Sequence, residues 1–176
     1  DRHYTLDRLK TFLAGVPTST KCKIYLLHGH MTEAEMSALY KNKNISAYVT
    51  TAHGEGFGLP AFEAVTNGLP VIASNWGGIE EYSGIEGKPL ITEVEYEVDN
   101  VKDFQVWGGV LEASAKWCFP DFTSLRSSMR EFYTDSTQAV QNAKKLKTHV
   151  NKTFSNKNIN KMYGDIITQV LSTKEK

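Results

Sequence analysis

The feature that most constrains the fold is the stretch from Thr50 to Ser74, which reads TTAHGEGFGLPAFEAVTNGLPVIAS. An apolar run leads into its glycines, and a second apolar run closes it. Pro60 stands where the first turn of a helix would begin, and Gly68 stands where that helix would end. A plain turn needs far fewer special residues. The stretch therefore predicts a strand, a glycine loop, a helix and a second strand in succession.

Helices and strands are expected to alternate along the first half of the chain. Thr32 followed by Glu35 forms a capping box, which predicts the start of a helix that runs to about Tyr40. Elements that alternate in this way are typical of a parallel sheet with helices on both faces, so we expect an α/β fold. The other expected elements are an amphipathic helix at 4–14, buried strands at 23–28, 45–52, 70–74 and 88–93, and a short helical segment at 77–82.

The second half of the chain predicts a helical tail. Residues 93–120 show no single hydrophobic period, and we interpret them as loop with some short strand. Asp121 then caps a helix, which is followed by a lysine-rich helix at 136–150 and a final amphipathic helix. The apolar side of the final helix carries residues at spacings of three and four: Ile159, Met162, Tyr163, Ile166, Ile167 and Val170. We interpret Trp107, Trp117, Phe119 and the aromatic residues of 122–133 as core rather than as a surface that stacks on a ligand.

Composition excludes several classes of protein. The 176 residues are enough for one domain with a full core, and equal numbers of acidic and basic residues argue against a nucleic-acid-binding surface. Cys22 and Cys118 form no CxxC pair, so we expect free thiols in a reducing compartment. We recognise neither a signal peptide nor an apolar run that could cross a membrane, and we expect a cytoplasmic location. The helical pattern begins almost at Asp1, so we expect a fragment of a longer protein.

The glycine loop has the character of a ligand site. Ligands of parallel α/β sheets bind at the carboxyl ends of the strands, where this loop lies. Its glycines let a ligand approach the backbone, and the following helix start favours an anion such as phosphate. Glu55 and Glu63, with seven residues between them, add strong acceptors for sugar hydroxyls. These features together suit a ligand that has phosphate in the middle and hydroxyls at both ends. A nucleotide sugar is such a ligand, because its diphosphate lies between a ribose and a hexose.

Two other phosphate motifs fail on their spelling. A dinucleotide fingerprint, GxGxxG, would need a third glycine or alanine where Leu59 stands. A P-loop, GxxxxGK[ST], would need glycine in place of Tyr82 and serine or threonine in place of Pro89, around Gly87 and Lys88. Neither motif explains the loop.

Residues 55–74, EGFGLPAFEAVTNGLPVIAS, resemble the signature of retaining GT-B glycosyltransferases of family 4 (group 1). The signature of that family contains two glutamates in the pattern E-x7-E. The resemblance implies the C-terminal, Rossmann-like half of a GT-B fold. Residues 1–176 would then form a single domain that binds the nucleotide-sugar donor, without the N-terminal acceptor domain.

The resemblance also implies roles for individual residues. Glu55 would contact hydroxyls of the transferred sugar near the reacting centre, as the catalytic residue, and Glu63 would bind the ribose. The backbone of four residues would meet the sugar and diphosphate: Gly56, Phe57, Gly58 and Leu59. The configuration of the transferred sugar would be retained, and neither a metal nor another cofactor would be needed. The absence of any Asp-x-Asp from the sequence agrees with a metal-free site.

The partners implied are a UDP- or GDP-sugar donor and the N-terminal domain of the same protein, with no nucleic acid. Peripheral membrane association of the full-length enzyme stays open. We expect this chain alone to be inactive. The family usually has an arginine and a lysine after the first strand of this domain, whereas here only Arg2 and His3 offer a counterpart. The alternatives are a nucleotide-sugar-binding module without catalysis, or another GT-B enzyme such as a phosphorylase or an epimerase.

Overall fold

The computed structural model describes residues 2–17 and 22–173. It comprises two compact units, residues 1–36 and residues 37–176, which we describe separately. The assignment of residues 1–176 to a single donor-binding domain stays a prediction.

The first unit contains α1 (Arg2–Ala14), at the position of the first predicted helix, and the start of α2 (Glu33–Tyr40). The predicted capping box is confirmed. The backbone N–H of Thr32 donates to the Glu35 carboxylate at 2.8 Å, and the backbone N–H of Glu35 donates to the Thr32 hydroxyl at 3.3 Å. Two backbone donors at the helix start are satisfied in this way.

The strand predicted at residues 23–28 is wrong. The described part of this segment is irregular, and the side chains of Ile24, Tyr25 and Leu27 are 51%, 83% and 67% exposed. A strand needs a neighbouring strand to satisfy its backbone groups. Within the described residues of the first unit, no such neighbour exists. The apolar run alone could not show what would cover it.

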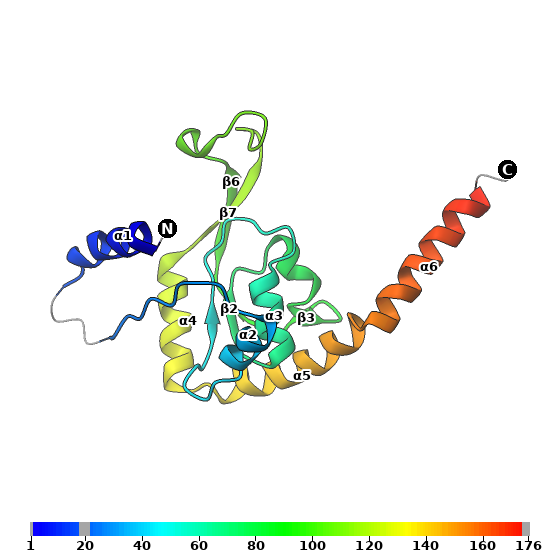
Figure 1. Ribbon diagram of the computed structural model, residues 1–176, viewed down its shortest axis with the longest axis horizontal. Coiled ribbons are helices and arrows are strands. Elements are labelled where there is room, and N and C mark those ends of the chain that lie inside the picture. The colour runs from blue at the N-terminus through cyan, green and yellow to red at the C-terminus, as the bar shows by residue number, and fades with distance from the viewer. Residues whose placement is uncertain (1, 18–21, 174–176) are drawn as a thin grey trace. The chain divides into compact units, whose positions relative to one another are not determined.

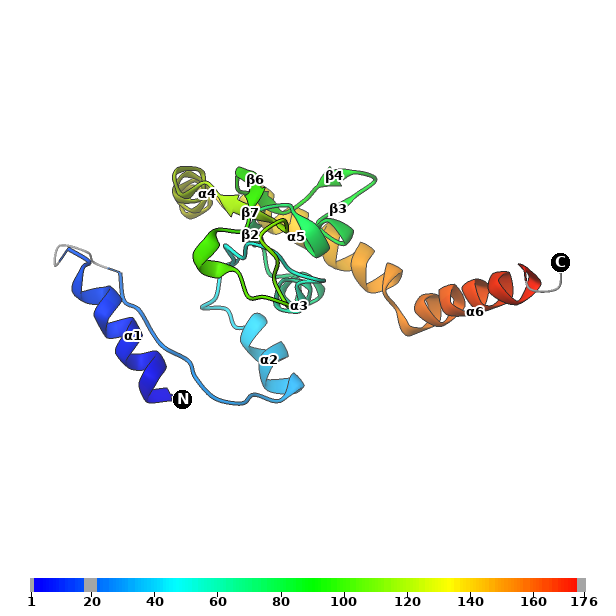
Figure 2. The ribbon, with the colours of Figure 1, turned by 90° about the horizontal axis from the view of Figure 1, so that it is seen from above.

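The second unit is built on a parallel sheet, β1 (Tyr48–Val49), β2 (Val71–Ala73) and β5 (Thr92–Glu93), in the order β1-β2-β5. Two helices, α3 (Leu59–Asn67) and α4 (Phe122–Thr134), lie on opposite sides of β2 (Figures 1 and 2). The expected α/β, Rossmann-like class is confirmed. The strands are shorter than predicted, and the run at 88–93 divides into β4 (Lys88–Pro89), antiparallel to β3 (Gly84–Ile85), and β5.

The core includes one side of α5 (Thr137–Thr153), the predicted lysine-rich helix, which packs mainly on α3. Leu146 and Val150 of α5 are buried with Ile72 of β2. Two side chains of α5 also bond the end of α3. Lys147 Nζ donates to the Asn67 carbonyl at 3.4 Å, and Asn151 Nδ2 donates to the Thr66 carbonyl at 3.1 Å. These bonds satisfy carbonyls that the last turn of a helix leaves without partners.

Two predicted helix boundaries are confirmed by their caps. Gly68, at the end of α3, has a left-handed φ of 82°, and its N–H donates to the Val65 carbonyl at 2.9 Å. At the start of α4, the Asp121 carboxylate accepts from the backbone N–H groups of Thr123 and Ser124 at 2.6 and 2.8 Å. The local sequence was sufficient to predict both helix boundaries, because each cap is formed by residues within four positions of one another.

Residues 93–120 form more regular structure than predicted. They contain an antiparallel hairpin of β6 (Tyr96–Asn100) and β7 (Lys116–Pro120), which extends from the second unit (Figure 1), with η2 (Asp103–Gln105) near its tip. The core interpretation is wrong for Trp107, which is 69% exposed, while Trp117 and Phe119 are half-buried. It is also wrong for Phe122 and Tyr133 of α4, which are 65% and 92% exposed.

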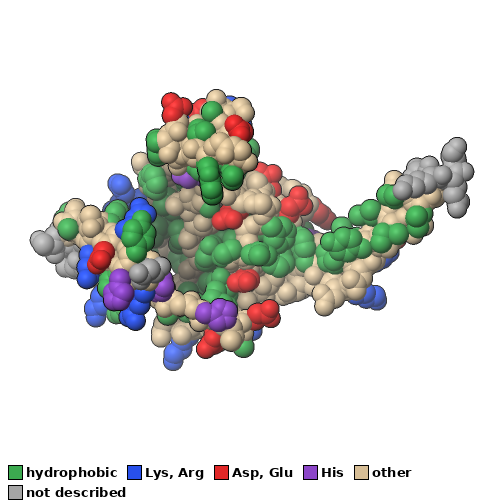
Figure 3. All heavy atoms as spheres, turned by 45° about the horizontal axis from the view of Figure 1, so that its top comes forward, with side chains coloured by type: hydrophobic (Ala, Val, Ile, Leu, Met, Phe, Trp, Pro, Cys, Tyr) green, Lys and Arg blue, Asp and Glu red, His purple; other side chains and the backbone are tan. Residues whose placement is uncertain are grey.

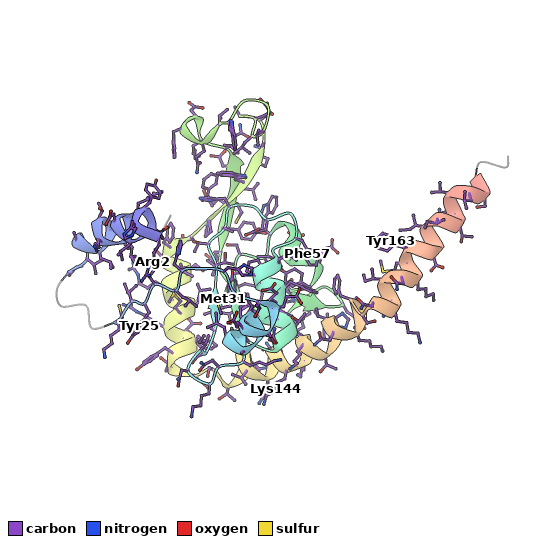
Figure 4. The ribbon with its side chains drawn as sticks, viewed as in Figure 1. Arg2, Tyr25, Met31, Phe57, Lys144 and Tyr163 are labelled. Carbon is purple, nitrogen blue, oxygen red and sulfur yellow. The ribbon has the colours of Figure 1, made fainter. Side chains whose placement is uncertain are left out.

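The final helix, α6 (Asn156–Thr173), confirms the predicted helical tail. Its hydrophobic side chains gather along the helix in Figure 3, and Tyr163, which is 64% exposed, projects outward in Figure 4. None of its side chains up to Ser172 is buried. Among the helices of residues 2–17 and 22–173, none is both long and apolar enough to cross a membrane.

Candidate functional site

The glycine loop, residues 53–58, follows β1 and leads directly into α3. Gly58 caps α3 with a left-handed φ of 76°, and its carbonyl accepts a 2.8 Å hydrogen bond from the buried Tyr82 hydroxyl. A Cβ at position 58 would lie only 2.8 Å from that hydroxyl oxygen. Both the backbone angle and the lack of space therefore require glycine at this position.

The segment after β2 packs directly on the glycine loop. This segment, η1 (Gly77–Glu81), is the predicted short helical turn, and the Gly78 N–H donates to the Glu55 carbonyl at 3.1 Å. A Cβ on Gly78 would overlap the Cα of Phe57 and lie 2.5 Å from the Gly56 carbonyl oxygen. The backbones following two adjacent parallel strands thus meet at one edge of the sheet, as predicted for a ligand site.

Glu55 and Glu63 are both exposed, and they share one neighbour, Tyr48 of β1. Burial raises the pKa of Tyr48, a bond with Thr50 partly opposes this, and the negative charges of Glu55 and Glu63 raise the pKa further. Because both carboxylates act on one hydroxyl, they lie in the same region of the molecule. The sequence-based expectation that the two glutamates come together is consistent with this arrangement.

Tyr40 of α2 is the second neighbour of Glu63. It is 8% exposed, and its ring packs edge-on against Tyr48 with centroids 6.4 Å apart. Burial first, and then the charge and hydrogen bonding of Glu63, raise the pKa of Tyr40 to about 12. The tyrosine therefore stays a neutral hydroxyl at physiological pH and can hold the carboxylate in position.

Residues 20–103 match the family model for glycosyl transferases group 1. No curated protein matches the chain. The matched range contains the glycine loop, both glutamates and Gly78, and it supports glycosyl transfer as the general reaction of this site.

Within the region that matches group 1 glycosyl transferases, the side chain and backbone of Phe57 have different surroundings. Its ring packs on Phe62, Tyr82 and Phe154, with centroids 5.0, 5.2 and 5.9 Å away, and Figure 4 shows it near the start of α3. The neighbouring Gly56 is exposed, and a Cβ there would meet nothing within 4 Å. The aromatic cluster thus anchors the loop while its backbone remains accessible. Leu59 is 62% exposed.

Two sets of residues differ from what the sequence suggested. Arg2 and His3, the proposed counterparts of the cationic pair in group 1 glycosyl transferases, lie in the first turn of α1 rather than after a strand. Conversely, sequence reasoning did not identify Tyr40, Tyr48 or Tyr82 as neighbours of the glutamates. The only available signal was that Tyr40 and Tyr82 stand at the ends of predicted helical segments, which does not indicate which side chains they meet.

A larger cavity, of about 940 Å³, lies elsewhere, between the residues after β5 and the first half of α4. It contains none of the predicted site residues. Its polar groups largely bond one another, since the Glu95 N–H donates to the Ser124 hydroxyl at 3.0 Å and the Ser128 hydroxyl donates to the Glu93 carbonyl at 3.2 Å. Its acidic lining would also repel a diphosphate. The glycine loop remains the candidate site.

Proposed function

We propose that the chain is the donor-binding domain of a retaining GT-B glycosyltransferase. The reaction would move a sugar from a nucleotide diphosphate sugar to an acceptor hydroxyl, without a metal or another cofactor. The observation that carries this proposal is that the negative charges of Glu55 and Glu63 both raise the pKa of Tyr48. Glu55 lies in the glycine loop that follows β1, and Glu63 lies in α3, which begins directly after that loop.

The two glutamates have different proposed roles. Glu55, in the loop, binds hydroxyls of the transferred sugar next to the reacting carbon. Glu63, in α3, binds the ribose hydroxyls, and Tyr40 limits the directions in which its carboxylate can point. Ionised carboxylates are strong hydroxyl acceptors, and each such charged hydrogen bond contributes about 1.5–3 kcal/mol.

The diphosphate has its own proposed place between these two groups. The first N–H groups of α3 have no partners within the helix, and the helix dipole is positive at this end. The backbone of Gly56 is exposed, and the open space beside it leaves room for the phosphates near those groups. As the bond to the sugar breaks, the leaving diphosphate gains negative charge, and these fixed dipoles stabilise it. We propose that no residue of this chain forms a covalent bond to the sugar.

Calorimetric titration of the 176-residue chain with UDP, GDP and ADP tests the proposal. We expect one nucleotide to bind, and Glu63→Ala to weaken its binding about 10- to 100-fold, the equivalent of about 1.5–3 kcal/mol. Glu131→Ala, which removes an exposed glutamate of α4, is the matched control and should bind as the wild type does. Equal binding by wild type and Glu63→Ala would contradict the proposed ribose contact.

A further inference from the structure

His53, the first residue of the glycine loop, is held by the β6–β7 hairpin. Its Nδ1 lies 2.7 Å from the Cys118 carbonyl oxygen, and its own carbonyl accepts a 2.8 Å bond from the Cys118 N–H. The Trp117 ring stacks on the imidazole with centroids 5.2 Å apart and planes within 2° of parallel. Phe119 contacts it as well, at 4.9 Å. These contacts restrict both the position and the rotation of the ring.

The hydrogen bond to Cys118 decides which nitrogen carries the proton. A carbonyl oxygen can only accept, so Nδ1 must be the protonated nitrogen. In the neutral ring, Nε2 is then a bare acceptor. Within residues 2–17 and 22–173, Nε2 has no hydrogen-bond partner.

Trp117 offers the complementary donor beside Gly54. A Cβ on Gly54 would lie 3.6 Å from Trp117 Cδ1 and 3.7 Å from Nε1, so the N–H edge of the indole lies against this glycine. Among the described residues, Nε1 also has no hydrogen-bond partner. Because position 54 has no side chain, a ligand at Glu55 can reach that edge.

We propose that His53 and Trp117 form a second sugar-recognition pair next to Glu55, a proposal that rests on the proposed function. His53 Nε2 accepts a hydrogen bond from a hydroxyl of the transferred sugar, and Trp117 Nε1–H donates to a sugar oxygen. Because the two rings are stacked, His53 Nε2 and Trp117 Nε1 are held in fixed positions relative to each other. Trp117 belongs to β7, so the hairpin takes part in selecting the sugar. In this proposal the pair contacts the transferred sugar, and the base and ribose bind near Glu63.

Two conservative variants separate recognition from folding. His53→Asn keeps a short side-chain donor near the position of Nδ1 but removes Nε2. Trp117→Phe keeps an aromatic ring to stack on His53 but removes the N–H. Trp107→Phe, at the exposed tip of the hairpin, is the matched control for the change from tryptophan to phenylalanine.

The test compares affinities for UDP-glucose, GDP-mannose and ADP-glucose with those for UDP, GDP and ADP. We expect His53→Asn and Trp117→Phe each to weaken binding of the preferred nucleotide sugar about three- to tenfold, the loss of one hydrogen bond. Affinity for the corresponding nucleoside diphosphate should be unchanged, as should both affinities in Trp107→Phe. In nitrogen NMR of the wild type, the His53 Nε2 signal should move when the nucleotide sugar is added and should not move when the nucleoside diphosphate is added.

The outcomes are distinguishable. If the wild type binds a nucleotide sugar and both variants bind it equally well, the recognition pair is wrong while the proposed function stands. The same conclusion follows if the variants lose affinity for nucleotide sugar and nucleoside diphosphate alike, since that would show a general change in the loop. If the wild type binds neither class of ligand, the proposed function fails and this inference fails with it.

Discussion

Tyr48 connects the two carboxylates of the candidate site because the negative charges of both Glu55 and Glu63 reach its hydroxyl. Tyr82 also contacts the loop, through its hydrogen bond to the Gly58 carbonyl, and burial first and Glu55 second raise its pKa. Neutral phenols around carboxylates supply donors without adding charge. The site therefore keeps its negative charge on the two glutamates, which are the groups proposed to bind sugar and ribose hydroxyls.

The raised pKa of Tyr40 gives a prediction about pH. Its folded-state pKa of about 12 lies above the value of about 10 for an unfolded chain. The neutral phenol therefore contributes stability below about pH 10, and that contribution is lost as pH rises from about 10 to 12. Unfolding in urea at several alkaline pH values should show this loss in the wild type and a smaller one in Tyr40→Phe.

A companion measurement separates the two causes of the shift. Glu63→Gln should lower the pKa of Tyr40, because it removes the negative charge while leaving the burial unchanged. The change can be followed by the tyrosinate absorbance, with Tyr40→Phe identifying the transition. Tyr133→Phe, at a position 92% exposed, should leave this transition where it is. An unchanged transition in Glu63→Gln would show that the carboxylate does not act on Tyr40.

At the scale of elements, the site depends on how closely η1 and the glycine loop approach each other. Their backbones meet through the 3.1 Å bond from Gly78 to Glu55, with no room for a side chain at position 78. At position 56, by contrast, a side chain would enter open space. Two glycines of the candidate site thus have different reasons for lacking a side chain: Gly78 because of close packing, and Gly56 because a ligand can reach its backbone.

This difference predicts opposite effects of two alanine substitutions. Gly78→Ala should lower the free energy of unfolding by about 1–3 kcal/mol. Its methyl group would overlap backbone atoms of Gly56 and Phe57, so the glycine loop would have to shift to make room. Gly56→Ala should leave that free energy within about 0.5 kcal/mol and instead weaken nucleotide-sugar binding. Urea denaturation and calorimetric titration of both variants measure the two quantities. A stable Gly78→Ala variant with normal binding would contradict the packing described here.

The cap of α4 gives a second prediction at this scale. Asp121→Ala should lower the free energy of unfolding by about 1 kcal/mol, because two backbone N–H groups lose their acceptor. Asp121→Asn keeps an oxygen in the same place and should cost less. Urea denaturation of the three proteins would test this, and equal losses in both variants would show that the charge rather than the cap stabilises α4.

At the scale of the second unit, Phe154 joins the end of α5 to the candidate site. Its ring lies 5.9 Å from that of Phe57 and 5.3 Å from that of Phe62. Beyond it, α6 has many exposed apolar side chains, among them Met162, Ile166 and Leu171 at 56%, 54% and 60%. The unit as described therefore gains little buried surface from α6, although the half-buried Phe154 packs on aromatic rings of the candidate site.

Two truncations test whether Phe154 contributes to the stability of the second unit while α6 does not. A chain that ends at Ser155 should keep the melting temperature of the wild type, because it removes only exposed or half-exposed side chains. A chain that ends at Thr153 also loses Phe154, and its free energy of unfolding should fall by about 1 kcal/mol or more, because the rings of Phe57 and Phe62 lose an aromatic neighbour. Thermal and urea denaturation would compare them. A large loss in the longer truncation would show that α6 contributes to the folded unit.

The sequence by itself determined the glycine loop, its helix and the helix caps. The capping box at Thr32, the left-handed Gly68 and the Asp121 cap are all local interactions, and residue type at fixed spacing specifies them. The tertiary structure alone decided which side chains meet. The pairing of β6 with β7, the stacking of Trp117 on His53 and the position of Tyr40 beside Glu63 join residues 16 or more positions apart. The apolar runs at 24–27 and in α6 show the same limit, because a hydrophobic pattern indicates which face can be buried but does not identify the surface that would cover it.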